Sequence, residues 1–259
     1  MLLRKAKPSD KLHVLKFCKN TFFWGDYIKD VWNFWIKEGH LLVIVKDVPI
    51  GFCHAIFSKN QVWIEGIRIN SKFRRQGLAS NLLIKIESMA SKKQIPILLM
   101  LIDTENSSSL LMVKNLGFKK NQTWKFYSLL SKKNHSSHVS VGNILQKKEF
   151  PFYVKSWRWL PLTQETISKL DSKNQIIFSQ EKGKKTVAIL QDSEHFEKTL
   201  IVTLFSGSKN NTLNIISFLQ NYGFEKKYQR IQILTKETLP EFKNLEHKIS
   251  FHLMKKLLS

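Results

Sequence analysis

A short basic segment, Arg74-Arg75-Gln76-Gly77-Leu78-Ala79, stands between an apolar stretch and an amphipathic one, and its residue types suit an anion. Free N–H groups at the start of a helix point outward and carry partial positive charge, so they can hold a pyrophosphate. Gly77 permits close approach of the backbone, the small Ala79 keeps the first turn open, and the arginines add charge-assisted hydrogen bonds. Taken alone, the same six residues also fit an ordinary solvated basic loop.

The elements around this segment must place the end of a strand beside the start of a helix. The hydrophobic pattern predicts a mixed α/β (α+β) sheet that does so, because alternating stretches mark strands and a spacing of about 3.6 residues marks helices. The predicted strands are 2–6, 41–46, 50–57, 61–69 and 96–102, with two more within 119–129; the predicted helices run from 8–10 to about 20, over 25–39 and 77–93, and from Asn106.

In this order of elements the sequence resembles the GNAT superfamily of N-acetyltransferases over about residues 2–130. The family's pyrophosphate loop reads Q/R-x-x-G-x-G/A between its fourth strand and third helix. A second family motif, N-x-x-[A/S] followed by G-F, opens and closes a later helix. The matching residues are Arg74, Gly77 and Ala79 in the loop, and Asn106, Ser109, Gly117 and Phe118 in the second motif.

The resemblance implies a GNAT fold with acetyl-CoA (coenzyme A) as the cofactor. Backbone groups at the end of the fourth strand would contact the pantetheine arm, the loop amides would hold the pyrophosphate, and the second motif would face the coenzyme. The tyrosine that often protonates the leaving thiolate falls at Val113, so water, another side chain or the thiolate itself must serve. The implied cofactor-binding residues are Ile67, Arg68, Ile69, Arg74, Arg75, Gln76, Gly77, Leu78, Ala79, Ser80, Asn106 and Ser109.

Transfer of an acyl group to an amine needs a base, directly or through water, because the nucleophile must be neutral. Glu65 is the first candidate, since it lies in an apolar strand where desolvation would make a carboxylate more basic. Strand alternation predicts that Glu65 shares a face with Trp63, Ile67 and Ile69. A structural role remains open, in which Glu65 pairs with Arg68, His54 or a substrate cation. His54, on the neighbouring strand, is the second candidate base, or else a hydrogen-bonded core histidine.

Aromatic residues gather in the helices that border the acceptor site in this superfamily. Trp24, Tyr27 and Trp63 are candidate substrate-binding residues, although packing in the core is the alternative for such side chains. Gly25-Asp26-Tyr27 and Trp63-Ile64-Glu65-Gly66-Ile67-Arg68 also resemble a GNAT subset that includes histidine N-acetyltransferase. A free amino acid or another small primary amine is therefore the first expectation for the acceptor.

The second half repeats the order of element types, which indicates an internal duplication. The predicted strands there are 152–160, 175–179, 186–190, 199–205 and 228–234; one helix opens at 161–165, and another runs from Asn210 or Asn211 through Leu219 and is ended by 221–224, which includes Gly223. We predict a catalytic GNAT domain over 1–133, a linker over 134–149 and a degenerate GNAT-like domain over 150–259. The last domain closes over the acceptor site or mediates association, with a homodimer as the expected assembly. This half has no Arg-x-x-Gly-x-Ala loop, and 206–210 is its only counterpart. His135 and His138 stand at a metal-like spacing without further ligands nearby, so we predict no metal site.

The formal net charge of +22 invites a nucleic-acid partner. The charge is spread evenly, +12 up to residue 130 and +10 beyond it, which favours a lysine-rich solvated surface instead. With two isolated cysteines, Cys18 and Cys53, and no leader-like or membrane-spanning apolar run, we expect a cytoplasmic protein with direct acetyl transfer. A non-catalytic acyl-CoA sensor and a basic RNA- or ribosome-associated protein remain the alternatives.

Overall fold

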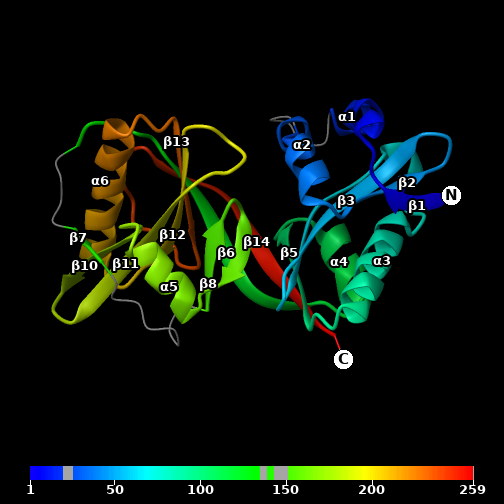
Figure 1. The fold of residues 1–259 in the computed structure, drawn as a ribbon. Helices are drawn as coiled ribbons and strands as arrows, with labels where there is room; N and C mark the ends of the chain where they lie inside the picture. The colour runs from blue at the N-terminus through cyan, green and yellow to red at the C-terminus, as the bar shows by residue number, and fades with distance from the viewer. Residues whose placement is uncertain (20–25, 135–138, 143–150, 259) are drawn as a thin grey trace. The chain divides into compact units, whose positions relative to one another are not determined.

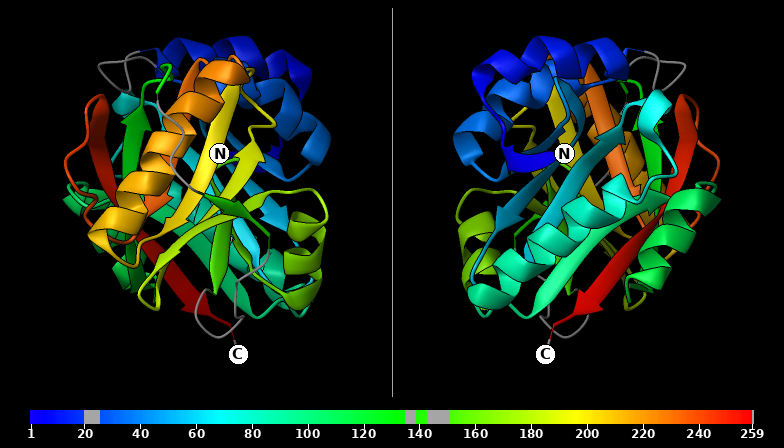
Figure 2. Two further views of the ribbon diagram at one scale, coloured as in Figure 1. Left: turned by 90° about the vertical axis from the view of Figure 1, so that its left-hand side faces the viewer. Right: turned by 90° about the vertical axis from the view of Figure 1, so that its right-hand side faces the viewer.

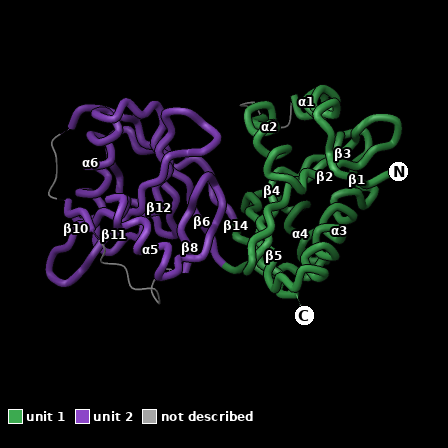
Figure 3. The backbone as a smooth tube through the Cα atoms, viewed as in Figure 1, with its two compact units in different colours: residues 1–121, 252–259 green, residues 122–251 purple. Residues whose placement is uncertain are grey.

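The computed structural model describes residues 1–19, 26–134, 139–142 and 151–258. The chain divides into two compact units, Met1–Asn121 with His252–Ser259 (unit 1) and Gln122–Phe251 (unit 2), which Figure 3 colours separately. The boundary between the units lies at Gln122, and the last eight residues of the chain belong to unit 1. The predicted domains were 1–133 and 150–259. Trp24, His135 and His138 lie outside the described residues, so the predictions made for them stay predictions.

Unit 1 is a mixed α/β structure, which confirms the predicted fold class. Its sheet has the order β1-β2-β3-β4-β5 followed by the end of β14, with β4 and β5 parallel. The strands are β1 (Leu2–Lys5), β2 (Leu41–Val45), β3 (Pro49–Phe57), β4 (Val62–Ile69), β5 (Ile97–Asp103) and β14 (Leu245–Leu257); the helices are η1 (Pro8–Asp10), α1 (Lys11–Cys18), α2 (Ile28–Glu38), η2 (Ser71–Phe73), α3 (Leu78–Lys92) and α4 (Ser107–Asn115).

Helices cover both faces of this sheet, α1 and α2 on one face and α3 and α4 on the other (Figure 1). On the first face, the rings of Phe17 and Trp32 both lie about 6 Å from the ring of Phe52 in β3. On the second face, helix α3 lies across the sheet (Figure 2, right-hand view), and its apolar side chains pack on it. This second core includes Leu82, Leu83 and Ile86 from α3, with Val62 and Ile64 from β4.

Unit 2 repeats the element order of unit 1, as the sequence predicts. An antiparallel meander, β10-β11-β12, leads into α6, and β13 then pairs with β12 in parallel. Helix α6 lies against this sheet (Figure 2, left view). The elements are β6 (Lys119–Leu129), β7 (Ser140–Val141), β8 (Phe152–Lys155), β9 (Arg158–Pro161), α5 (Gln164–Asp171), β10 (Ile176–Glu181), β11 (Lys184–Asp192), β12 (Thr199–Phe205), α6 (Lys209–Glu225) and β13 (Arg230–Thr235).

Three boundaries differ from the sequence predictions. β6 is one continuous strand, because no turn forms at Asn121-Gln122. The stretch predicted as one strand over 152–160 is a hairpin, since Ser156 and Trp157 both take positive φ and turn the chain between β8 and β9. Gly223, predicted to end a helix, lies within α6, where its missing side chain admits Ile231. In the described part of the chain, every helix is too short or too polar to cross a membrane.

Candidate active site

A β-bulge at Gly66 shapes the site. Phe52 lies opposite Arg68 and His54 lies opposite Glu65, so β4 has one residue more than β3 between these pairs. The extra residue breaks the alternation of faces. Glu65 and Arg68 therefore both face α2, whereas Ile67 and Ile69 pack on the core below α3. The prediction that Glu65 shares a face with Ile67 and Ile69 is wrong for this reason.

Gly66 is required at the bulge on two grounds. Its φ is +67°, and an added Cβ would lie 2.4 Å from the ring of Trp35. Strain in the left-handed region costs an L-residue about 1–2 kcal/mol, and overpacking a buried ring adds about 1–3 kcal/mol. We expect Gly66→Ala to lower the free energy of unfolding by about 3 kcal/mol, measured by urea denaturation. Gly183→Ala is the matched control.

Gly183 has a φ of +75°, and a Cβ there would meet no described atom within 4 Å. The control therefore measures backbone strain alone, at about 1 kcal/mol. Equal losses for the two variants would show that the contact with Trp35 is not tight.

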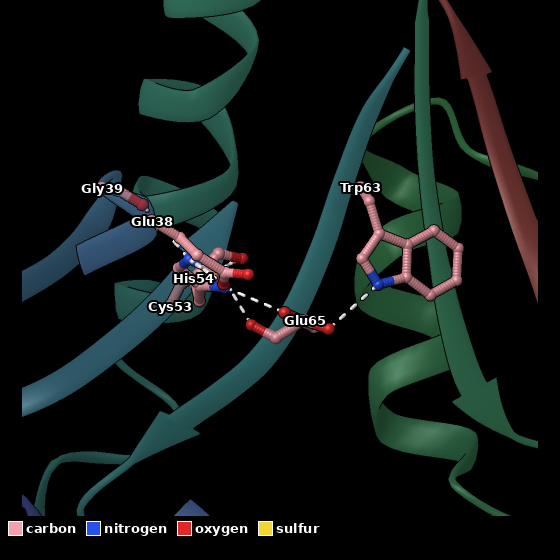
Figure 4. A network of polar contacts seen from close by, with 6 residues as sticks. All are labelled: Glu38, Gly39, Cys53, His54, Trp63 and Glu65. Atoms are coloured by element: carbon pink, nitrogen blue, oxygen red, sulfur yellow. Dashed lines mark hydrogen bonds and ion pairs between the residues drawn. The ribbon is translucent and has the colours of Figure 1, made fainter. Parts of the chain in front are cut away.

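Four side chains form a polar network on the α2 side of β3 and β4 (Figure 4). Nδ1 of His54 lies 2.9 Å from Oε1 of Glu65, and Nε1 of Trp63 donates to Oε2 of Glu65 at 3.1 Å. Nε2 of His54 donates to the carbonyl oxygen of Gly39 at 3.1 Å and lies 3.7 Å from Oε2 of Glu38. The ring of Trp35 stacks on His54 with centroids 4.8 Å apart. Both candidate bases thus belong to one site.

The partners determine how many protons the His54–Glu65 pair holds. The carbonyl of Gly39 can only accept, so Nε2 of His54 carries a proton. The 2.9 Å contact between Nδ1 and Oε1 needs one further proton, which belongs to either atom, because two lone pairs would repel. The His54 side chain is fully buried and that of Glu65 is 14% exposed. The pair is therefore a buried, neutral unit with one exposed edge.

The other predicted substrate residues have different surroundings. Trp63 is 3% exposed, and its indole N–H orients Glu65, so its described contact is with the candidate base. Tyr27 as a residue is 37% exposed, yet burial of its hydroxyl raises the pKa of Tyr27 to about 12. Arg68 stands over that ring and donates to Asp26 at 2.9 Å. Asp26, which holds Arg68 in place, was not among the predicted site residues.

The last half of β4 is not paired with β5. Their parallel register runs from Val62↔Leu98 to Ile64↔Met100, and no described residue of β5 pairs with Glu65 or any later residue of β4. Beyond Ile64 this edge of β4 therefore has no pairing with β5, and the carbonyl oxygens of Ile67 and Ile69 accept instead from the guanidinium groups of Arg68 at 3.0 Å and Arg74 at 3.2 Å. The chain then passes through η2 into α3, so the open strand end and the helix start are consecutive.

The predicted anion loop forms the start of α3. Gly77 is the residue before the helix, in the left-handed conformation with φ +73°, and no side chain caps the helix there. The amides of Leu78, Ala79 and Ser80 belong to the first turn, which has no carbonyls four residues earlier to bind. Arg75 also has a positive φ of 64°, and the side chains of residues 74–77 are exposed. The guanidinium of Arg74 bonds back to Ile69 O at 3.2 Å, which ties the loop to β4.

The second motif has a structural role that is visible in the contacts. Oδ1 of Asn106 accepts from the amide of Ser109 at 3.1 Å and from the Ser108 hydroxyl at 3.1 Å, so Asn106 caps α4. Val113, at the position of the family's tyrosine, is fully buried in the α3 core. Helix α4 therefore offers no hydroxyl at that position.

Both cysteines are buried, and they form no disulfide with each other. Burial raises the pKa of the Cys18 thiol to about 12, and burial raises that of Cys53 further. Because a thiolate is the nucleophilic form, neither thiol suits a covalent acyl carrier.

The family model described as "Acetyltransferase (GNAT) family" matches residues 10–118, a segment that contains the bulge, the polar network and the loop. No curated protein has a matching sequence.

Solved structures share the fold over the whole chain. A candidate acetyltransferase from Thermoplasma acidophilum is 14% identical with a TM-score of 0.66, and the alignment covers 100% of each chain. A GCN5-related N-acetyltransferase from Sphaerobacter thermophilus is 10% identical with a TM-score of 0.66, covering 99% of this chain and 95% of that one. At such identities the likeness shows the fold alone. By the sequence match, residues 10–118 of this chain are similar to the acetyltransferase domain of the GNAT family.

Proposed function

We propose that this protein transfers the acetyl group of acetyl-CoA directly to a small primary amine, such as an amino acid, with Glu65 as the proton acceptor. The observation that carries the proposal is the geometry of Glu65. His54 and Trp63 hold its two carboxylate oxygens, at the point where β4 parts from β5. The proposal joins this carboxylate to the family's use of acetyl-CoA.

The described residues fit the coenzyme at two places. A Cβ at Gly77 would meet no described atom within 4 Å, so the backbone of the loop is open to a close anion. The free amides of residues 78–80 and the charges of Arg74 and Arg75 would hold the diphosphate. The edge of β4 beyond Ile64, which does not pair with β5, would hold the pantetheine amides by strand-like hydrogen bonds. When bound, acetyl-CoA supplies an activated acetyl group.

Glu65 has the contacts of a positioned base. An ammonium acceptor must lose a proton before its nitrogen can attack a carbonyl, and Oε2 of Glu65 has a second lone pair beside the one that Trp63 occupies. The hydrogen bond to His54 fixes the carboxylate plane and leaves the pair neutral before the proton arrives. Because Val113 is buried in the core, it supplies no proton for the departing thiolate, so water, another side chain or the thiolate itself would serve.

Turnover with a panel of amines tests the proposal. Acetyl-CoA is mixed with each free amino acid and with simple primary amines, and release of the coenzyme thiol is followed together with the mass of the acetylated amine. Thiol release that depends on an amine supports the proposal. Coenzyme binding without thiol release would favour the sensor alternative, and RNA binding that survives change of the loop would favour the third alternative.

One coenzyme A is expected per chain, because unit 2 fills the corresponding place with its own atoms. The amide of Gly207 donates to Thr186 Oγ1 at 2.9 Å, and a Cβ on Gly207 would lie 1.8 Å from Lys185 O. β12 and β13 pair over five positions, from Thr199↔Arg230 to Thr203↔Leu234, whereas β4 and β5 pair over three. Calorimetric titration with coenzyme A measures the stoichiometry, and two sites per chain would contradict this reading.

A further inference from the structure

Glu38, at the end of α2, is a second carboxylate beside His54. Its Oε2 lies 3.7 Å from Nε2, whereas Glu65 bonds to Nδ1, so the imidazole stands between two carboxylates (Figure 4). The donor atoms of the three side chains lie within 4.8 Å of one another. Both ring nitrogens already have hydrogen-bond partners, Glu65 and the carbonyl of Gly39, so we assign no metal to the group.

We propose that Glu38 acts through His54 to increase the proton affinity of the His54–Glu65 pair, and so sets the pH range in which the pair accepts the proton of the amine. The proposal rests on the proposed function, because the proton acceptor is the same. Glu38 is a positioning residue in this scheme, and it does not touch the substrate.

The physical reason is the change of charge on the pair. The pair is neutral with one proton in its Nδ1···Oε1 contact, and it becomes positive when Glu65 accepts another. A negative charge 3.7 Å from the ring favours the positive state. The His54 side chain is fully buried, which limits screening, and Glu38 is 31% exposed, which reduces but does not remove the effect.

The other groups around the pair do not supply this charge. Burial lowers the pKa of His40, and Lys5, Lys93 and His54 lower it further, which favours the neutral ring near pH 7. Burial raises the pKa of Cys53 and of Tyr27, so both stay protonated. The titratable and charged groups that face the pair are Glu38 at the end of α2, Tyr27 and Asp26 before it, His40 before β2 and Arg68 on β4, and Arg68 is paired with Asp26. Cys53 on β3 packs in the core below α3, with its Sγ 3.7 Å from the backbone oxygen of Glu65.

The sign of the effect follows from the charge. Without Glu38 the pair gives up its extra proton at lower pH, so it is ready to act as a base at lower pH. We expect Glu38→Gln to move the midpoint of the acid limb of kcat/KM for the amine about half to one pH unit downward. Glu38→Asp keeps the charge and should stay near wild type. Asp30→Asn, which removes a charge from the exposed first turn of α2, is the matched control.

A titration of the His54 ring by 15N NMR provides a readout that does not depend on turnover. Glu38→Gln should lower its midpoint in the same direction, and Asp30→Asn should not. If Glu38→Gln and Asp30→Asn give the same midpoint in the ring titration, the inference about Glu38 is overturned, whether or not the enzyme turns over. If the ring titration shifts and no amine supports thiol release, the electrostatic role stands and the proposed function falls.

Discussion

Glu65→Gln is expected to lower kcat by about 10²–10⁴-fold while leaving the affinity for coenzyme A unchanged. Glutamine has the shape of glutamate, and its amide can keep both contacts: the oxygen accepts from Trp63 Nε1, and the NH₂ group donates to Nδ1 of His54. The substitution therefore preserves the network and removes only the ability to accept a proton. Steady-state kinetics at saturating acetyl-CoA, with calorimetry for coenzyme binding, measures the two quantities separately.

Trp63→Phe is the comparison variant for this prediction. It removes one hydrogen bond to Glu65 and keeps most of the buried ring, so the base stays in place with less restraint. Its kcat should fall by much less than that of Glu65→Gln. A kcat of Glu65→Gln within about threefold of wild type would mean that another group, or water alone, accepts the proton.

Most of the fold of unit 1 could be predicted from the sequence. The spacing of the apolar residues and the order of the family's elements indicate the same helices and strands there. β2, β3, β4, α3 and β5 lie within one or two residues of their predicted bounds. β14 was not predicted, since Leu245–Leu257 shows neither strict alternation nor a continuous apolar run. Its assignment to two units depends on contacts with residues far away in the chain, and no local pattern encodes such contacts.

The site could be predicted by residue type and not by orientation. Glu65, His54 and the loop were found from chemistry and spacing, and the structure brings Glu65 and His54 within 2.9 Å. The bulge reversed the faces after Gly66, so the alternation rule placed Ile67 and Ile69 on the wrong side. A glycine within an otherwise β-branched strand was the available signal for that bulge. Glu38 was missed because its position beside His54 depends on how α2 packs, which its sequence neighbours do not reveal.

Gly77→Ala is expected to raise the Kd for coenzyme A by about 10–100-fold with only a small loss of stability. The φ of +73° costs an alanine about 1–2 kcal/mol in the left-handed region. No described atom lies within 4 Å of the added Cβ, so the substitution meets no steric conflict in the free protein. If the diphosphate lies against the backbone of this loop, as proposed, the methyl group would hold it away and weaken one or two charge-assisted hydrogen bonds to it.

Gly183→Ala separates the two effects of that substitution. Its φ of +75° and its open surroundings match those of Gly77, so it should lower the free energy of unfolding by a similar amount. Because Gly183 lies in the turn between β10 and β11 of unit 2, it should leave the Kd for coenzyme A unchanged. Calorimetry and urea denaturation on both variants give the comparison. If Gly77→Ala bound coenzyme A as tightly as Gly183→Ala does, the start of α3 would not be the diphosphate site, and the proposal for acetyl-CoA would lose its anchoring group.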